Sequence, residues 1–398
     1  MISAADQRAY RLSSIDMLRG LVILIMPLDH TRDFFSVSMS IDPLSDPNVS
    51  LPLAFTRWIT HFCAPVFVFL AGTSAGLMVT RKLPSELFQF LLTRGLWLIF
   101  VEMFVLSTAV TFAPGGIEQL SGQTLVFMQV LWAIGASLVL LAILQFLGRK
   151  TCLALGALIV LGHNALDGHW PTSASIMDTS PPLWAALHVP MAKVAGPFFF
   201  VLLYPLLPWL GVMLLGFGAA ALFEREPVAR NHALLLWGLG ITALFIVLRW
   251  IDNYGEPNHW EAHTRGAATV IDFLNTTKYP PSLLFIAMTL GPAAILCAFA
   301  DRMRGFVKDT LVMYGRVPFT FYVPHFFVLH LLSLGLGALQ GVPVSQLLTF
   351  PAFFPPNYGV SLLAVYGVWL LVIVLLYPLC RWMADLKARS RAWWLSYV

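Results

Sequence analysis

Charged residues are scarce in this sequence, and their scarcity identifies the class of protein. Asp, Glu, Lys and Arg make up only 11% of the 398 residues, whereas 58% are hydrophobic. Because a soluble domain carries roughly 25% charged residues, this composition excludes an ordinary water-soluble fold. The basic residues behind the net charge of +4 are scattered along the chain, so no nucleic-acid partner is expected. The chain is predicted to be an integral membrane protein.

Cysteine is also rare. The four cysteines, Cys63, Cys152, Cys297 and Cys380, are isolated from one another, and no C-x-x-C spacing occurs. Zinc sites and disulfide frameworks depend on such spacings. We therefore expect neither a metal site nor a disulfide-stabilised fold.

Internal repeats and soluble segments are missing as well. We interpret residues 1–398 as a single membrane domain, in which 12–222 carries the main polar motif and 223–398 completes the bundle. The missing repeat argues against a carrier, because many transporters are built from two related halves.

Apolar runs dominate what remains. About ten of them are long enough to cross a bilayer, which takes ~20 residues of helix. The expected spans are roughly 15–36, 54–79, 87–112, 123–147, 151–167, 194–222, 232–250, 280–300, 310–339 and 359–380. The predicted fold class is all-α, a polytopic bundle of about ten transmembrane helices.

Basic residues are shared unevenly between the two sides of this bundle. If the N-terminus is cytoplasmic, fifteen Lys and Arg residues lie at the cytoplasmic ends of the spans and six at the opposite ends. This positive-inside bias places both termini in the cytoplasm. The longest connections then face outward, at 37–53, 168–193, 251–279 and 340–358.

The first span contains the most informative polar pair. Arg19 and His30 are eleven residues apart, which returns a helix to within about 20° of the same face after a rise of roughly 16 Å. Ionisable groups at such depth are costly and usually line a protein-enclosed cavity. His30 is a candidate general base, and Asp33 or Asp29 could support its imidazolium form. Arg19 is a candidate anion contact.

Further candidates lie in other spans. His61, about two turns inside the second span, is an alternative base. Arg94 and Arg316 recur at a depth similar to that of Arg19. If the three arginines converge, which the sequence alone does not establish, they would suit a phosphate-bearing ligand. Glu102 could be an ion-pair partner of Arg94 or a second acid.

The remaining polar candidates are assigned to substrate contacts. Prolines 318 and 324 predict a kinked ninth span that lines a cavity, and Tyr322 and His325 share one of its faces. The other candidates lie near the outer ends of the spans and are Arg32, Arg57, Lys278 and Tyr279.

Each of these residues also has a purely structural interpretation. Arg19 could reach the headgroups along an apolar stem, and His30 could anchor the end of its span. His61 could form a hydrogen bond between helices. These alternatives stay open at the level of the sequence.

Four segments resemble a known family. They are RLSSIDMLRG…LDHTRDFF, FTRWITHFCAPVFVFLAGTSA, FLNTTKYPPSL and GRVPFTFYVPHF. The chain resembles the bacterial branch of the heparan-α-glucosaminide N-acetyltransferase family over nearly its whole length. Its Arg19/His30 spacing is also similar to that of the wider transmembrane acyltransferase superfamily, in which this pair is taken as essential.

The resemblance implies an acyltransferase of the bacterial inner membrane. Acetyl-CoA or another acyl-CoA would bind from the cytoplasm, and an amino sugar or glycan at the outer side would accept the acyl group. The lysosomal enzyme has a proposed catalytic histidine in its first luminal loop, whereas residues 50–55 here contain none. We therefore expect direct transfer without an acyl-histidine intermediate.

A transporter is the alternative function, and a second copy of the chain is a candidate partner. A proton-coupled transporter or exporter of a small anionic or sugar metabolite would also need buried Arg, His and Glu residues; binding of CoA discriminates between the two functions. Besides membrane lipids, a second copy of the chain is a candidate partner. The segments LLGFGAAA and LGLGALQG could pack between copies as easily as within one chain.

Overall fold

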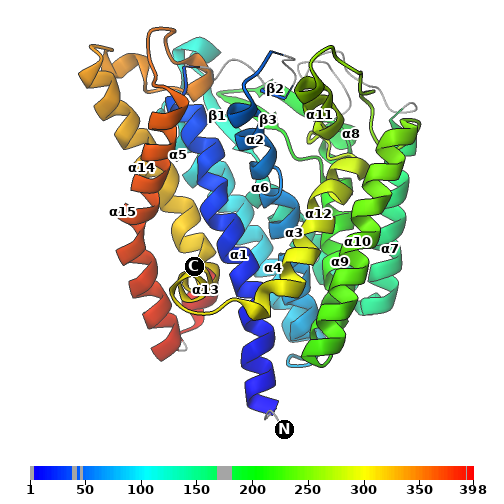
Figure 1. Cartoon of the computed structure of the whole chain (residues 1–398). Helices are drawn as coiled ribbons and strands as arrows, with labels where there is room; N and C mark the ends of the chain where they lie inside the picture. The colour runs from blue at the N-terminus through cyan, green and yellow to red at the C-terminus, as the bar shows by residue number, and fades with distance from the viewer. Residues whose placement is uncertain (1–3, 38–42, 45–47, 168–181, 391) are drawn as a thin grey trace.

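The chain is mostly helical in the computed structural model (Figure 1). The structure describes residues 4–37, 43–44, 48–167, 182–390 and 392–398. Within these residues, eight helical segments are long and apolar enough to cross a membrane. They are Leu51–Met78, Pro84–Thr111, Val130–Leu147, Leu206–Phe223, Pro227–Ile251, Leu283–Arg302, Pro318–Leu339 and Leu362–Arg389. The chain is a polytopic membrane protein, which confirms the predicted fold class.

The elements follow one another in a long series of helices interrupted by a small sheet. The helices are α1 (Ala4–Phe35), α2 (Leu51–Thr60), α3 (Cys63–Met78), α4 (Pro84–Phe100), α5 (Ser107–Thr111), α6 (Val130–Leu144), α7 (Arg149–Gly162), α8 (Pro182–Leu187), α9 (Leu206–Phe223), α10 (Pro227–Ile251), α11 (Gly266–Leu274), α12 (Leu283–Phe299), α13 (Phe306–Arg316), α14 (Pro318–Leu339) and α15 (Leu362–Arg389). The strands are β1 (Thr124–Met128), β2 (Met191–Ala195) and β3 (Phe198–Leu202). A π-helical turn, η1 (Val101–Leu106), joins α4 to α5.

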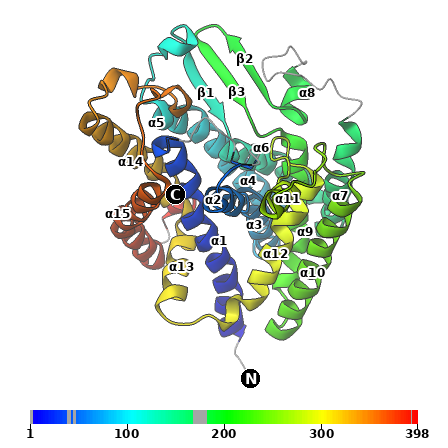
Figure 2. The same cartoon turned by 45° about the horizontal axis from the view of Figure 1, so that its top comes forward.

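Helix α1 lies in the middle of the bundle in both views (Figures 1 and 2). It packs against α3, α13, α14 and α15. Its 32 residues extend about 48 Å, enough to cross the hydrocarbon core. It approaches α13 most closely at two glycines. A Cβ on Gly20 would lie 1.8 Å from the main-chain oxygen of Leu311, and one on Gly315 would lie 1.7 Å from that of Asp16.

The other helices form tight pairs around this centre. Helix α9 packs against both α3 and α7, α10 packs on α12, and α4 packs on α6. Helix α7 has 14 residues, so it extends about 21 Å and is shorter than the expected span at 151–167. The outer loops expected at 37–53 and 168–193 fall partly outside the described residues.

A three-stranded sheet covers the end of the bundle away from the start of α1, and we call this the sheet end (Figures 1 and 2). The strand order is β1-β3-β2. Strand β1 pairs in parallel with β3, and β2 pairs antiparallel with it. Residues 124–128 and 198–202 were expected inside membrane spans and are strands instead. A short apolar run does not distinguish a strand from a segment of buried helix.

Two expected spans are also divided. Helix α13 ends at Arg316 and α14 begins at Pro318, since a proline has no N–H and disfavours helical geometry at the residue before it. The second span breaks between α2 and α3, at His61 and Phe62.

Candidate functional site

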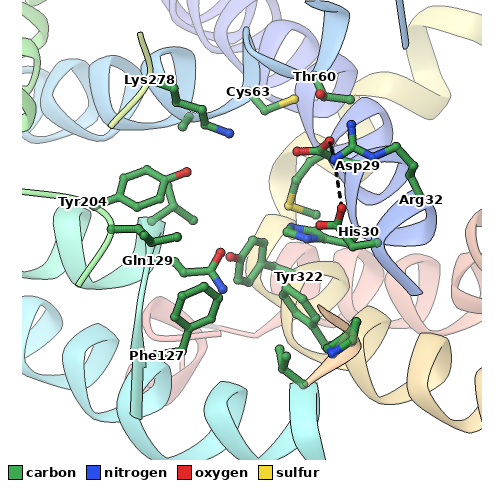
Figure 3. Close-up of a pocket in the computed structure, with 18 of the residues that line it drawn as sticks. Asp29, His30, Arg32, Thr60, Cys63, Phe127, Gln129, Tyr204, Lys278 and Tyr322 are labelled. Atoms are coloured by element: carbon green, nitrogen blue, oxygen red, sulfur yellow. Dashed lines mark hydrogen bonds and ion pairs between the residues drawn. The ribbon is translucent and has the colours of Figure 1, made fainter. Parts of the chain in front are cut away.

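Two cavities lie inside the bundle and share a wall. The first, of about 230 Å³, is near the sheet end (Figure 3). The second, of about 350 Å³, lies beside α4, the α13–α14 junction and the C-terminal segment. Phe67, Val130 and Tyr322 line both cavities. We call these three residues the shared wall.

His30 comes from α1 and lines the first cavity. Its ring lies between neighbours on α14, with its centroid 4.5 Å from that of Phe326 and 5.4 Å from that of His325. Among the described residues, neither of its ring nitrogens has a hydrogen-bond partner. Packing therefore holds the imidazole, and Figure 3 shows it facing the cavity.

The carboxylates beside His30 are bonded to arginines. Asp29 accepts from Arg57 at 2.6 Å and pairs with Arg32 at 3.1 Å. Asp33 pairs with Arg32 at 2.9 Å. Asp33, the carboxylate expected to lie best for His30, is thus paired with Arg32, and no hydrogen bond joins it to the imidazole among the described residues. The charges of both carboxylates still face the same cavity as the imidazole.

Two of the expected site histidines lie outside this cavity. His61 follows the end of α2, and its ring packs 5.3 Å from that of Phe285 on α12. His325 is fully buried and donates from Nδ1 to the main-chain oxygen of Tyr322. Neither residue borders the first cavity. The structure thus leaves His30 as the histidine of this cavity, among the residues it describes.

Lys278 and Tyr279 line the first cavity as expected, and the Lys278 ammonium lies 5.2 Å from the centre of the Tyr279 ring. Gln129, Tyr204 and Cys63 line it too, although the sequence analysis did not select them for the site. Gln129 directly precedes an apolar run and carries no local signal that would have identified it.

The second cavity is lined by four cationic side chains, Arg19, Arg94, Arg316 and Lys387. Arg19 donates to Asp16 at 3.0 Å, to Ser74 at 3.0 Å and to the main-chain oxygen of Gly315 at 3.1 Å. The three arginines suggested by the sequence thus converge on one space.

The other cations of this cavity are held more loosely. Arg316 lies 3.7 Å from Asp16 and is 60% exposed. Arg94 has no hydrogen-bond or ion-pair partner among the described residues and lies 6.0 Å from the centre of the Phe90 ring. Lys387 was not predicted; it donates to the main-chain oxygens of Arg316, at 3.3 Å, and Val398.

Glu102 does not pair with Arg94, contrary to one of the two expectations. It lies in η1 and accepts from the main-chain nitrogens of Leu131 at 2.6 Å and Trp132 at 3.2 Å. The carboxylate therefore caps the start of α6, where the first N–H groups of a helix lack partners.

The C-terminal segment forms part of the wall of the second cavity. Leu395, Ser396 and Val398 line it. Tyr397 attaches this segment to α4 by two hydrogen bonds. One joins the hydroxyl groups of Tyr397 and Thr93, which are 2.8 Å apart, and in the other Trp97 Nε1 donates to the main-chain oxygen of Tyr397 at 3.2 Å. No motif in the sequence marks these residues as part of a site.

A comparison with protein families matches residues 11–251 to the model described as "Heparan-alpha-glucosaminide N-acetyltransferase, catalytic". The match covers more than half of the chain, from residue 11 within α1 to the end of α10. It spans Arg19, His30 and Arg94 but ends before Lys278 and Tyr322. None of the curated proteins matches the chain.

Proposed function

The chain belongs to the heparan-alpha-glucosaminide N-acetyltransferase catalytic family, and on this basis we propose that it moves an acetyl group from acetyl-CoA to an amino sugar or a glycan hydroxyl. Acetyl-CoA, the donor used by the family, would bind in the second cavity. The acceptor would bind in the first. The membrane is the bacterial inner membrane, with both termini cytoplasmic and the sheet end facing outward.

The observation that carries this proposal is the shared wall. A cavity rich in cations and a cavity that contains an unbonded imidazole meet at Phe67, Val130 and Tyr322. Transfer between two ligands requires their reacting atoms to come within about 3–3.5 Å. The cavities adjoin at these three residues, so this is where a donor in one cavity and an acceptor in the other would approach one another.

The donor half rests on charge and length. Arg19, Arg94 and Arg316 offer planar guanidinium groups, which suit phosphate oxygens, and Lys387 adds a fourth cation. Arg19 and His30 are on one helix, separated by roughly 16 Å of rise. An extended pantetheine arm covers a comparable distance, so phosphates at one end would leave the thioester near the other.

The acceptor half rests on His30. Its imidazole takes a proton from the acceptor amine or hydroxyl as the new bond forms. Asp29 and Asp33 stabilise the imidazolium by charge, while their arginines keep both carboxylates in place. Transfer is direct, within a complex of both substrates. We assign His61 and His325 to packing between helices and not to proton transfer.

The acceptor itself is held by groups around the mouth of the first cavity. Arg32, Arg57, Lys278 and Tyr279 line this space and supply hydrogen-bond donors suited to sugar hydroxyls. All four lie toward the sheet end, the side on which the acceptor is proposed to enter.

Binding of acetyl-CoA to the purified protein in detergent tests this function. A ligand at 100 times its dissociation constant stabilises the folded state by about 2.7 kcal/mol, so a thermal melt should reveal it. We expect stabilisation by acetyl-CoA, a smaller effect from dephospho-CoA, which lacks one phosphate, and a loss of both in Arg19→Ala. No stabilisation at millimolar acetyl-CoA would contradict the proposal and favour a transporter, to be tested by uptake into vesicles.

A further inference from the structure

The shared wall contains one polar side chain, Tyr322, among the three residues that line both cavities. Gln129 directly precedes Val130 of the shared wall in the sequence and lines the first cavity. Figure 3 shows the Gln129 carboxamide and the Tyr322 hydroxyl pointing toward one another across this space. In the described part of the chain, neither side-chain group has a hydrogen-bond partner. Two unengaged donors therefore lie where the cavities meet.

Hydrogen bonds fix the main chain on both sides of Gln129, although the Gln129 side chain has no hydrogen-bond partner among the described residues. It sits between β1 and α6 and is the residue that precedes the first turn of α6. Ser107 Oγ accepts from the main-chain nitrogen of Phe127 at 2.9 Å and donates to the main-chain oxygen of Glu102 at 3.1 Å. On the α6 side of Gln129, the Glu102 carboxylate accepts hydrogen bonds from the main-chain nitrogens of Leu131 and Trp132. π-helical turns such as η1 occur frequently at functional sites.

We propose that the Tyr322 hydroxyl and the Gln129 carboxamide are catalytic hydrogen-bond donors, which stabilise the oxyanion formed on the thioester carbonyl. This inference rests on the proposed function. It assigns a role to one residue that the sequence analysis placed among substrate contacts and to one that it missed.

The reaction step places the negative charge at this wall. The lone pair of the acceptor attacks the carbonyl carbon, and the carbonyl π electrons move onto oxygen. The tetrahedral intermediate then collapses, the C–S bond breaks, and the sulfur leaves with its electron pair. The acceptor proton passes to His30, and CoA thiolate takes up a proton to complete the thiol. Donors fixed near the carbonyl oxygen stabilise both transition states.

Other donors are less suited to this role. The start of α6 also points its N–H groups toward the junction, but Glu102 already accepts from Leu131 and Trp132. Arg32 and Arg57 are engaged with Asp29. Lys278 lines the first cavity but not the second. Tyr322, which lines both cavities, and Gln129, which precedes Val130, are the unengaged donors where the cavities meet.

The test compares Tyr322→Phe and Gln129→Leu with the wild-type protein. Acetyl transfer is followed to D-glucosamine and, separately, to hydroxylamine, a small nucleophile that needs no sugar subsite. Removing one oxyanion donor typically lowers kcat by roughly 10² to 10³. We expect a loss of this size for each variant with both nucleophiles, while the KM for acetyl-CoA changes less than threefold. Tyr377→Phe, on α15 outside both cavities, is the matched control.

The outcomes separate this inference from the function on which it rests. If the wild type transfers acetyl groups and either variant keeps kcat within threefold, Tyr322 and Gln129 are not oxyanion donors. A variant that loses acetyl-CoA stabilisation together with turnover has a structural or binding role instead, which also overturns the inference. If the wild type neither binds acetyl-CoA nor transfers its acetyl group, the proposed function fails first and the inference fails with it.

Discussion

The first cavity carries three cations, Arg32, Arg57 and Lys278, and two carboxylates, Asp29 and Asp33. Both carboxylates are bonded to arginines. The second cavity carries four cationic side chains and no Asp or Glu side chain among the described residues that line it. Nearly balanced charge suits the binding of a sugar and the movement of a proton, whereas an excess of cationic side chains suits an anion such as a nucleotide phosphate. The two cavities should therefore respond differently to substitution of their charged and titratable residues.

The largest effect is expected for His30→Ala. General base catalysis typically contributes 10² to 10⁴ in rate, so acetyl transfer to D-glucosamine should fall by about 10³. Stabilisation by acetyl-CoA should persist, because His30 does not line the second cavity. His232→Ala, an exposed histidine on α10, should change neither measurement. Loss of acetyl-CoA binding in His30→Ala would contradict the separation of the two cavities.

The next effect concerns the stability of the first cavity. Asp29 is shared by two arginines and is only 13% exposed, so Asp29→Asn leaves buried positive charge uncompensated. We expect the free energy of unfolding to fall by about 3 kcal/mol, measured by denaturation in detergent. Glu224→Gln breaks the more exposed pair with Arg149 and should cost less than about 1 kcal/mol. Equal losses in the two variants would argue against a buried charge network.

A smaller effect is expected from the cations of the second cavity. Arg94→Ala removes a guanidinium that has no partner among the described residues, and a hydrogen bond to a charged group contributes about 1.5–3 kcal/mol. The dissociation constant for acetyl-CoA should therefore rise roughly 10- to 100-fold, with kcat little changed at saturation. Arg302→Ala lies outside both cavities and serves as the control. An unchanged affinity in Arg94→Ala would remove this arginine from the donor site.

The smallest effect is expected for Lys387→Met. Lys387 already donates to two main-chain oxygens, and an ammonium is a less directional phosphate contact than a guanidinium. We expect the affinity for acetyl-CoA to fall less than in Arg94→Ala, by about two- to fivefold. Titrations at low and high salt check the charge contribution, since screening weakens exposed ion pairs. A fall larger than that of Arg94→Ala would reverse the proposed ranking.

Three of the four cations that line the second cavity could be selected from the sequence. Arg19, Arg94 and Arg316 are rare cations within apolar runs, and such residues usually face the inside of a bundle; the structure brings them to one cavity. His30 could be found for the same reason. The spacing between Arg19 and His30 was enough to place them on one face of a helix, because α1 is continuous from Ala4 to Phe35.

The errors arose where the chain departs from one continuous helix. His61 lies at the break after α2, where its ring packs against Phe285 and does not line the cavity that contains His30. The partner of Glu102 is 29 residues away along the chain, a distance at which local patterns carry no information. Gln129 occupies the junction of a strand and a helix, and the strand itself was read as part of a span.

The shared wall also has an electrical consequence. If the two cavities open toward opposite faces of the membrane, as proposed, the membrane potential falls largely across Phe67, Val130 and Tyr322. The CoA thiolate then remains in the second cavity, while the acylated product and the released proton form in the first. One unit of charge is therefore displaced across the membrane in each turnover, unless the proton returns past Tyr322 to the thiolate. Each displaced charge is worth about 2.3 kcal/mol per 100 mV. Turnover in sealed vesicles should then respond to an imposed diffusion potential, and a proton path along the wall would abolish that response.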